Sequence, residues 1–197
     1  VGSEMCLRDR SHPREGVVLQ RVSSLNLRIA RARKIALPPG LAEILQGHFT
    51  GLLVAGEPDS GKTTLLRSMA AFLAGLGRAV AVIDERGEFW PEEMRAARPP
   101  VDTVAGLPKA QAVQMALRTL APQAVLLDEL GGLEEVRGLE QGFFSGVDYI
   151  ASLHAAAPDE ALRRPQVAYM REKGMLRVLV MLAGRQAPGQ IAGVCRV

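Results

Sequence analysis

The segment Gly56–Thr63 constrains the fold of this chain more than any other, because it fits the pattern G-x-x-x-x-G-K-[ST] of a phosphate-binding loop. This pattern requires a buried strand before the loop and a helix after it. The apolar run 52–55 predicts the strand, and residues 62–74 predict the helix. The sequence therefore predicts a P-loop nucleotide-binding domain.

A nucleoside triphosphate is the ligand that this loop predicts. Its glycines allow successive N–H groups to face phosphate oxygens, and the helix N-terminus adds positive potential. Lys62 would supply a positive charge, and the Thr63 hydroxyl would be a Mg²⁺ ligand. Glu57 and Asp59 place two carboxylates in the loop, where we expect their charge to oppose the phosphates. The predicted ATP-binding residues are Gly56, Glu57, Pro58, Asp59, Ser60, Gly61, Lys62, Thr63 and Thr64.

The composition is that of one aliphatic core with a basic leader. Of the 197 residues 48% are hydrophobic but only 4% are aromatic, so aliphatic side chains must build the core. Residues 1–50 carry a net charge of +4 and residues 51–197 a net charge of −1. Cys6 and Cys195 fit no metal or redox spacing and predict free thiols in a reducing, cytoplasmic compartment. No apolar run approaches the roughly 18 residues that a membrane span needs.

We divide the chain into three segments. Residues 1–16 are polar and rich in arginine, which predicts a disordered or remnant N-terminal segment. We expect residues 17–37 to form a leader strand and linker, with alternating apolar positions over 25–31, and residues 38–197 to form the nucleotide-binding domain. The chain begins with Val1 rather than Met, which predicts a fragment of a longer protein.

Predicted strands and helices alternate along residues 38–197, a pattern typical of a mainly parallel α/β sheet with helices on both faces. Residues 176–182 and 191–197 predict a closing C-terminal β-hairpin. The other predicted strands are 52–55, 79–83, 124–127 and 147–153. The predicted helices are 41–46, 62–74, a weak one at 91–97, one that begins at Pro108, 133–142 and 158–172.

An acidic pair, Asp128 and Glu129, follows the predicted strand 124–127 and has the form of a Walker B element. Ligands of open α/β sheets bind beyond the carboxyl ends of the strands. Asp128 would hold Mg²⁺ directly or through water, and Glu129 would orient or polarise the attacking water. The alternative is an acidic turn before Gly131.

Two further strand ends carry polar residues. In the segment Asp84–Glu88, carboxylates such as Glu85 could share metal and water with Glu129, although a solvated loop fits the pattern equally well. His154 could donate to a phosphate oxygen or to the water network, although lone histidines are more often structural.

Phosphoryl transfer also needs positive charge near the γ-phosphate, which in ring-shaped ATPases often comes from a neighbouring subunit or domain. Arg28, Arg31 and Arg33 are the candidates in the leader, and a solvated basic strand is the alternative.

Four segments have the order and approximate spacing of the Walker A, aspartate, Walker B and histidine boxes of secretion ATPases. They are Gly56–Thr63, Asp84–Glu88, Leu127–Gly131 and Ala151–His154. Within that group the chain most resembles the family of stage III sporulation protein AA, in its C-terminal ATPase portion and over about residues 17–197. This closer resemblance is carried by Ser23–Arg31, Gly61–Arg67, Ile83–Arg86 and Leu120–Gln123.

The resemblance implies a RecA-like, Mg²⁺-dependent motor ATPase that forms a hexamer-like ring and drives a membrane channel during endospore formation. Glu129, Glu85 and His154 would be catalytic, and Thr63 and Asp128 would hold Mg²⁺. The protein would be cytoplasmic and would reach the membrane through channel proteins, without direct nucleic acid binding. The family usually has Pro and Gly in its loop where Glu57 and Asp59 stand here.

Three other functions share the same core. A RecA-type DNA-dependent ATPase is disfavoured by the nearly neutral core and the few aromatic residues. A small-molecule kinase would need an arginine-rich lid, and no such stretch follows Walker B. A weakly active, nucleotide-gated scaffold is favoured by Glu57 and Asp59.

Overall fold

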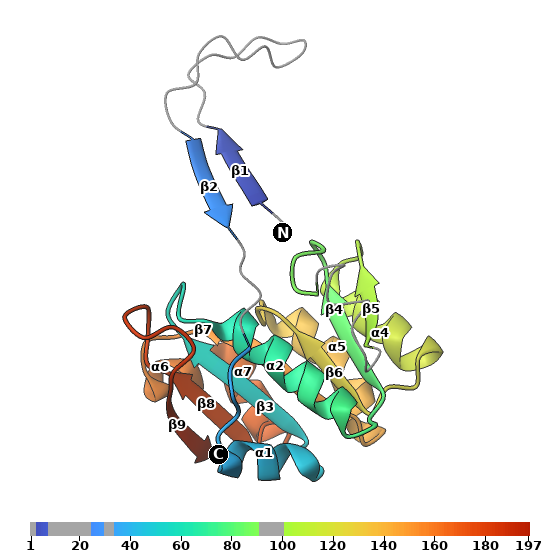
Figure 1. Ribbon diagram of the computed structural model, residues 1–197. Helices are drawn as coiled ribbons and strands as arrows, with labels where there is room; N and C mark the ends of the chain where they lie inside the picture. Colours follow the sequence, from blue (N-terminus) through green and yellow to red (C-terminus); the bar gives the residue numbers. More distant parts are fainter. Residues whose placement is uncertain (1–2, 8–24, 30–33, 91–100) are drawn as a thin grey trace, which may run out of the picture. The chain divides into compact units, whose positions relative to one another are not determined.

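The computed structural model describes residues 3–7, 25–29, 34–90 and 101–197, and it divides the chain into two units, 1–33 and 34–197 (Figure 1). In the first unit β1 (Ser3–Leu7) pairs antiparallel with β2 (Leu25–Ile29). The position of β2 confirms the strand predicted from alternation. β1 lies in the segment 1–16, where no periodic pattern predicted a strand, and the division into domains stays a prediction.

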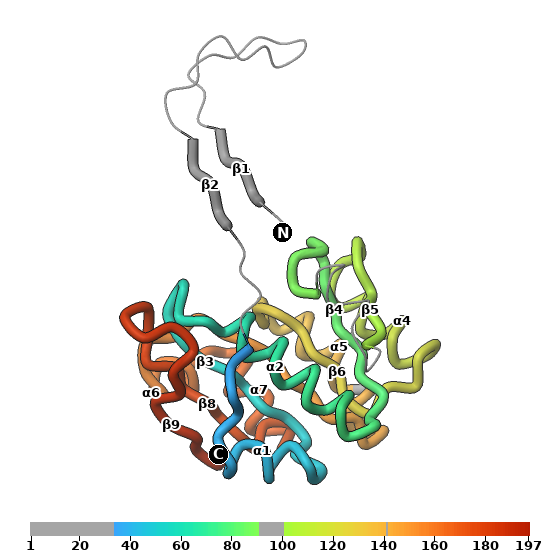
Figure 2. The backbone as a smooth tube through the Cα atoms, in the orientation of Figure 1, coloured from blue at the N-terminus to red at the C-terminus, as the bar shows by residue number. Residues whose placement is uncertain are grey.

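A seven-stranded sheet with the order β5-β4-β6-β7-β3-β8-β9 forms the centre of the second unit. Neighbouring strands are parallel except β8 and β9, which are antiparallel and confirm the predicted hairpin. In the sheet β8 lies next to β3 and β9 lies next to β8, although β8 begins more than a hundred residues after β3 in the sequence; Figure 2 shows β8 and β9 in red. The strands are β3 (Gly51–Gly56), β4 (Val80–Asp84), β5 (Asp102–Ala105), β6 (Ala124–Leu127), β7 (Asp148–His154), β8 (Val178–Leu182) and β9 (Ile191–Arg196).

Side chains of the central strands alternate between two cores, because successive strand residues point to opposite faces. On β3, Leu52 and Val54 join one core and Leu53 and Ala55 the other. The first core includes α1 (Pro39–Gln46) and α2 (Lys62–Gly75). The second includes α4 (Lys109–Thr119), α5 (Leu133–Phe144), α6 (Pro158–Arg163) and α7 (Pro165–Glu172). Helices thus cover both faces, as predicted, with α1 and α2 in front of the sheet in Figure 1.

Two details differ from the predicted elements. β5 was not predicted, because only Val104 of its four residues is buried. The helix predicted over 158–172 is two helices, since Pro165 holds the preceding Arg164 in an extended conformation with ψ 132°. The weak helix predicted at 91–97 lies outside the described residues. No helix in the described part of the chain has the length and apolar character that a membrane crossing needs.

The carboxyl ends of the parallel strands meet at one edge of the sheet. β3 ends at Gly56, β4 at Asp84, β6 at Leu127 and β7 at His154. β7 lies between β3 and β6, so its last residues separate the phosphate loop from the acidic pair. All four predicted boxes therefore converge on this edge.

Candidate functional site

A cavity of about 410 Å³ opens at this edge of the sheet. It brings together predicted site residues from the phosphate loop, the end of β6 and the end of β7. These residues are Asp59, Gly61, Lys62, Thr63, Thr64, Asp128, Glu129 and His154. Ser152 and Pro188, for which we predicted no individual role, complete the lining.

The phosphate loop is held against the turn between β8 and β9. Gly189 donates its backbone N–H to the Ser60 carbonyl at 2.7 Å. Gly61 has φ 92°, in the left-handed region, and a Cβ at this position would lie 2.6 Å from the Gly189 nitrogen. Only glycine satisfies both requirements, the backbone angle and the close approach. The β8–β9 hairpin therefore packs against the phosphate loop, and its strand β9 also forms one edge of the sheet.

Lys62 lies at the base of the loop with three acceptors around its ammonium group. Its Nζ donates to the carbonyls of Gly56 at 3.0 Å and Glu57 at 2.7 Å, and lies 3.1 Å from Nδ1 of His154. An ammonium group only donates, so Nδ1 of His154 must be the acceptor and Nε2 then carries the proton. A phosphate oxygen would replace one of these three acceptors.

Two opposing influences act on the pKa of Lys62. Burial lowers the pKa of Lys62 from its ordinary value, and the carboxylates of Asp128, Glu129 and Asp59 oppose that shift. Phosphate groups would act in the same direction as these carboxylates. The site therefore favours a charged lysine most strongly when an anion is bound.

The Thr63 hydroxyl and the Asp128 carboxylate are in direct contact. The Thr63 hydroxyl donates to Oδ2 of Asp128 at 2.6 Å. The Ser152 hydroxyl, from β7, donates to Oδ1 at 2.6 Å and accepts the Glu129 N–H at 2.8 Å. Ser152 is fully buried and thus fixes both acidic residues with one oxygen atom. No role was predicted for Ser152, although it shares its face of β7 with Ile150, on the side of the sheet that α2 covers.

Glu129 lies at the rim of the cavity, with its side chain 62% exposed. Its Oε1 is 3.9 Å from Nε2 of His154, so the histidine reaches both Lys62 and Glu129. The backbone of Glu129 has φ 58°, which is uncommon for a residue other than glycine. Lys109, which was not predicted, donates from its Nζ to the Glu129 carbonyl at 2.5 Å.

The segment Asp84–Glu88 separates into a structural residue and an exposed one. Asp84 is buried, and its two carboxylate oxygens accept the backbone N–H groups of Glu88 at 2.9 Å and Trp90 at 2.8 Å. Asp84 therefore closes the turn after β4. Glu85 is exposed and lines a second cavity, of about 140 Å³, that also touches Glu129. Glu85 is not a lining residue of the larger cavity.

Arg67 connects this turn to the helix of the phosphate loop. It lies four residues after Thr63 on α2, and its guanidinium donates to the carbonyls of Phe89 and Glu88 at 2.6 Å each. Burial lowers the pKa of Arg67 from its ordinary value, against the influence of Asp128 and Asp84. Both the turn and Thr63 are thus anchored on the first two turns of α2.

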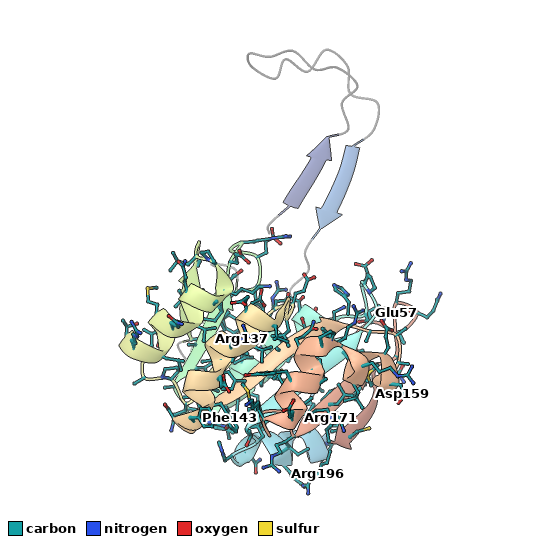
Figure 3. All side chains as sticks on the ribbon, turned by 180° about the vertical axis from the view of Figure 1, so that it is seen from behind. Glu57, Arg137, Phe143, Asp159, Arg171 and Arg196 are labelled. Carbon is teal, nitrogen blue, oxygen red and sulfur yellow. The ribbon has the colours of Figure 1, made fainter. Side chains whose placement is uncertain are left out.

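The two loop carboxylates have different surroundings. Glu57 leans toward the β8–β9 turn, where its Oε2 would be 3.1 Å from a Cβ on Gly184, and Figure 3 shows it at the edge of the domain. It does not line the cavity, whereas Asp59 does. Asp59 is therefore the carboxylate that would face a bound phosphate chain.

None of the leader arginines belongs to the second unit, residues 34–197, in which this site lies. Arg28 lies in β2 of the first unit, and Arg31 and Arg33 lie outside the described residues. Of the two cysteines, Cys195 on β9 is free and exposed.

The donor set of the larger cavity fits a Mg²⁺-bound triphosphate. Mg²⁺ prefers one or two carboxylates together with phosphate oxygens and water over an all-protein cage. Thr63 and Asp128 supply such a pair, and in the described part of the chain no group of three or more His, Cys, Asp or Glu residues forms a cage. Lys62 and the loop amides would hold the phosphates.

Sequence comparison identifies relatives of the whole domain. The profile of the family "Sporulation stage III, protein AA" matches residues 15–196. Stage III sporulation protein AA of Bacillus subtilis (strain 168) is 28% identical over 188 residues, which cover 89% of this chain and 60% of that protein. The chain thus spans less than two thirds of this relative's length.

Two solved structures have a similar fold. The ATPase DotB of Legionella pneumophila matches with a TM-score of 0.62 at 19% identity, over 91% of this chain and 52% of that chain. The pilus retraction motor PilT, with bound ADP, also matches with a TM-score of 0.62, at 21% identity, over 79% of this chain and 50% of that chain. The likeness confirms the predicted α/β fold of P-loop ATPases.

Proposed function

Since the chain belongs to the sporulation stage III protein AA family, we propose that it is a Mg²⁺-dependent ATPase that binds and hydrolyses ATP. The observation that carries this proposal is the contact between Thr63 and Asp128, at 2.6 Å, in the cavity that Lys62 also lines. It joins the phosphate loop to the acidic end of β6 in the arrangement that phosphoryl transfer requires.

Each residue has a distinct task in this proposal. Bound Mg²⁺ would neutralise charge that develops on the phosphates during transfer. Thr63 and Asp128 hold the ion, while Lys62 donates to the β- and γ-phosphates. Glu129 lies at the rim, where its carboxylate can accept a proton from, or orient, an attacking water.

His154 and Glu85 have supporting roles. The Nε2 proton of His154 faces Glu129, and its Nδ1 accepts from Lys62. In this proposal His154 links the ammonium group of Lys62 to the Glu129 carboxylate, and its Nε2 proton would be donated to a γ-phosphate oxygen when ATP is bound. Glu85 tunes the charge beside Glu129 from the neighbouring cavity.

We also propose that the protein acts as a motor. PilT, whose fold is similar, is a pilus retraction motor that was solved with ADP. In this proposal the full-length protein forms a hexamer-like ring in the cytoplasm, at the inner face of a membrane channel of the sporulation apparatus. One of Arg28, Arg31 and Arg33 would act on the nucleotide of a neighbouring subunit.

A weakly active, nucleotide-gated scaffold is the second candidate. Two observations favour it: the ammonium of Lys62 is satisfied within the protein, and Asp59 lines the phosphate cavity. Both features would reduce affinity for the triphosphate. They do not remove the residues needed for hydrolysis.

Phosphate release measured with and without Mg²⁺ tests the proposal. We expect Glu129→Gln to lower kcat by about 100-fold or more, because it removes the base and keeps the shape. Glu134→Gln, an exposed residue of α5 that pairs only with Arg137 in the described structure, is the matched control and should match the parent. Equal rates for the parent and Glu129→Gln would contradict the assignment of Glu129. Tight nucleotide binding with no Mg²⁺-dependent release by the parent would favour the scaffold.

A further inference from the structure

Lys109 lies at a helix position that disfavours a cation. It is the first residue of α4, after the N-cap Pro108, and the first turn contains no acidic residue. The unpaired N–H groups at a helix N-terminus carry positive potential, which repels an ammonium group. The Lys109 side chain is nevertheless only 15% exposed. Contacts outside the helix must therefore account for a lysine at this position.

These contacts are with the segment directly after β6. Lys109 Nζ donates to the Glu129 carbonyl at 2.5 Å and lies 3.9 Å from Oε1 of Glu135. The other oxygen of Glu135 accepts the Gly131 N–H at 2.8 Å. Lys109 and Glu135 thus bind the peptide groups on both sides of Leu130.

The same segment contains the unusual backbone of Glu129. A left-handed conformation of a residue other than glycine persists only where its surroundings hold it. Here the Glu129 N–H donates to Ser152, and the Glu129 carbonyl accepts from Lys109. Because these two groups flank the α-carbon, the two hydrogen bonds restrain both of its backbone angles. The direction of the Glu129 side chain follows from them.

We propose that Lys109 is a positioning residue, which keeps the Glu129 carboxylate at the phosphate cavity by holding the Glu129 carbonyl. Lys109 lines the smaller cavity and not the larger one, so it acts through Glu129 without touching the nucleotide. Lys109, at the start of α4, thereby influences kcat through the position of Glu129. This inference rests on the proposed ATP hydrolysis.

Three variants test this role in steady-state phosphate release. Lys109→Met removes the donor and keeps most of the bulk, and we expect kcat to fall about 10- to 100-fold, because a small misplacement of a reacting group has this effect. KM for ATP should change less than about threefold, since ground-state contacts remain. Lys109→Arg restores a donor and should recover most of the rate. Arg118→Met, an exposed residue on the same helix, is the control and should match the parent.

A double variant separates positioning from a general structural effect. In a Glu129→Gln background, Lys109→Met should cause no further loss, because it acts only through Glu129. An additional loss of about tenfold would overturn the inference, as would a parental kcat for Lys109→Met alone. Binding of a fluorescent ATP analogue reports that each variant is folded, and Lys109→Gln carries the same expectations should Lys109→Met unfold.

The outcomes also distinguish this inference from the proposed function. A parent that hydrolyses ATP, with an inactive Glu129→Gln and a fully active Lys109→Met, would leave the proposed function in place and remove the role of Lys109. A parent without Mg²⁺-dependent release would overturn both.

Discussion

Replacing Asp148 by asparagine is expected to lower the free energy of unfolding by about 3 kcal/mol. Asp148 begins β7, at the end opposite the phosphate cavity, and is fully buried. Its Oδ1 accepts the backbone N–H groups of Phe49 at 3.1 Å and Thr50 at 2.6 Å and lies 2.8 Å from Nδ1 of His48. Its Oδ2 accepts from the Arg78 guanidinium at 2.5 Å. One carboxylate thus joins the α1–β3 connection, the start of β4 and the start of β7.

The magnitude follows from what asparagine keeps and loses. Its oxygen still accepts the backbone N–H groups, but without charge assistance each bond weakens by about 1 kcal/mol. Its NH₂ group then faces the Arg78 guanidinium, so that two donors meet. These weakened bonds are part of the total cost of breaking a buried ion pair, which is about 3–5 kcal/mol. Arg78 is 17% exposed and also donates to the Gln123 carbonyl, so the lower end of this range applies.

Urea unfolding followed by circular dichroism measures this change. For a domain of this size, with a slope of about 2–3 kcal/mol per molar, the midpoint should fall by about 1–1.5 M. Asp102→Asn, at an exposed position of β5, is the control and should leave the midpoint unchanged. A loss below about 1 kcal/mol for Asp148→Asn would refute the reasoning, because it would show that the buried charge adds nothing to the hydrogen bonds that asparagine retains.

Two further substitutions test features of the core and the hairpin. The Tyr149 hydroxyl is buried and has no hydrogen-bond partner in the described structure, so Tyr149→Phe should raise the free energy of unfolding by about 1 kcal/mol at pH 7. Burial also raises the pKa of Tyr149 above the unfolded value of about 10, so the parent should lose stability as the pH rises beyond 10, and the loss measured by urea unfolding should be smaller for Tyr149→Phe. Gly189→Ala places a Cβ 2.7 Å from Cδ1 of Ile35 at φ 85° and should weaken binding of a fluorescent ATP analogue, because the Gly189 N–H supports Ser60. Gly77→Ala, at φ 80° in open space, should show only the backbone cost of about 1 kcal/mol, and equal nucleotide affinity for both variants would count against the role of the hairpin.

The parts of the fold that could be predicted from sequence are those with a local cause. The strand at 124–127 has four buried apolar residues in a row, and α2 follows a glycine-rich loop, so both were predicted nearly to their ends. β5 could not be predicted, because an edge strand with one buried residue has little hydrophobic signal. The division between α6 and α7 could have been predicted, since Pro165 lies within the helical segment.

The residues of the candidate site also differ in whether a local sequence motif identifies them. Lys62, Thr63 and Asp128 were predicted because each belongs to a local motif. Lys109 could not be predicted, because its contact with Glu129 spans 20 residues and depends on the packing of α4 beside the end of β6. Tertiary structure alone brings such side chains to the site.

The place of β7 between β3 and β6 has a consequence for synthesis on the ribosome. The phosphate loop ends at residue 63 and the acidic pair at residue 129, but the strand that joins them runs from Asp148 to His154. A nascent chain that stops before β7 has both halves of the site with no sheet between them. Ser152, which fixes both acidic residues, also arrives with this strand. The residues of the candidate site therefore come together only after the chain has been synthesised through β7.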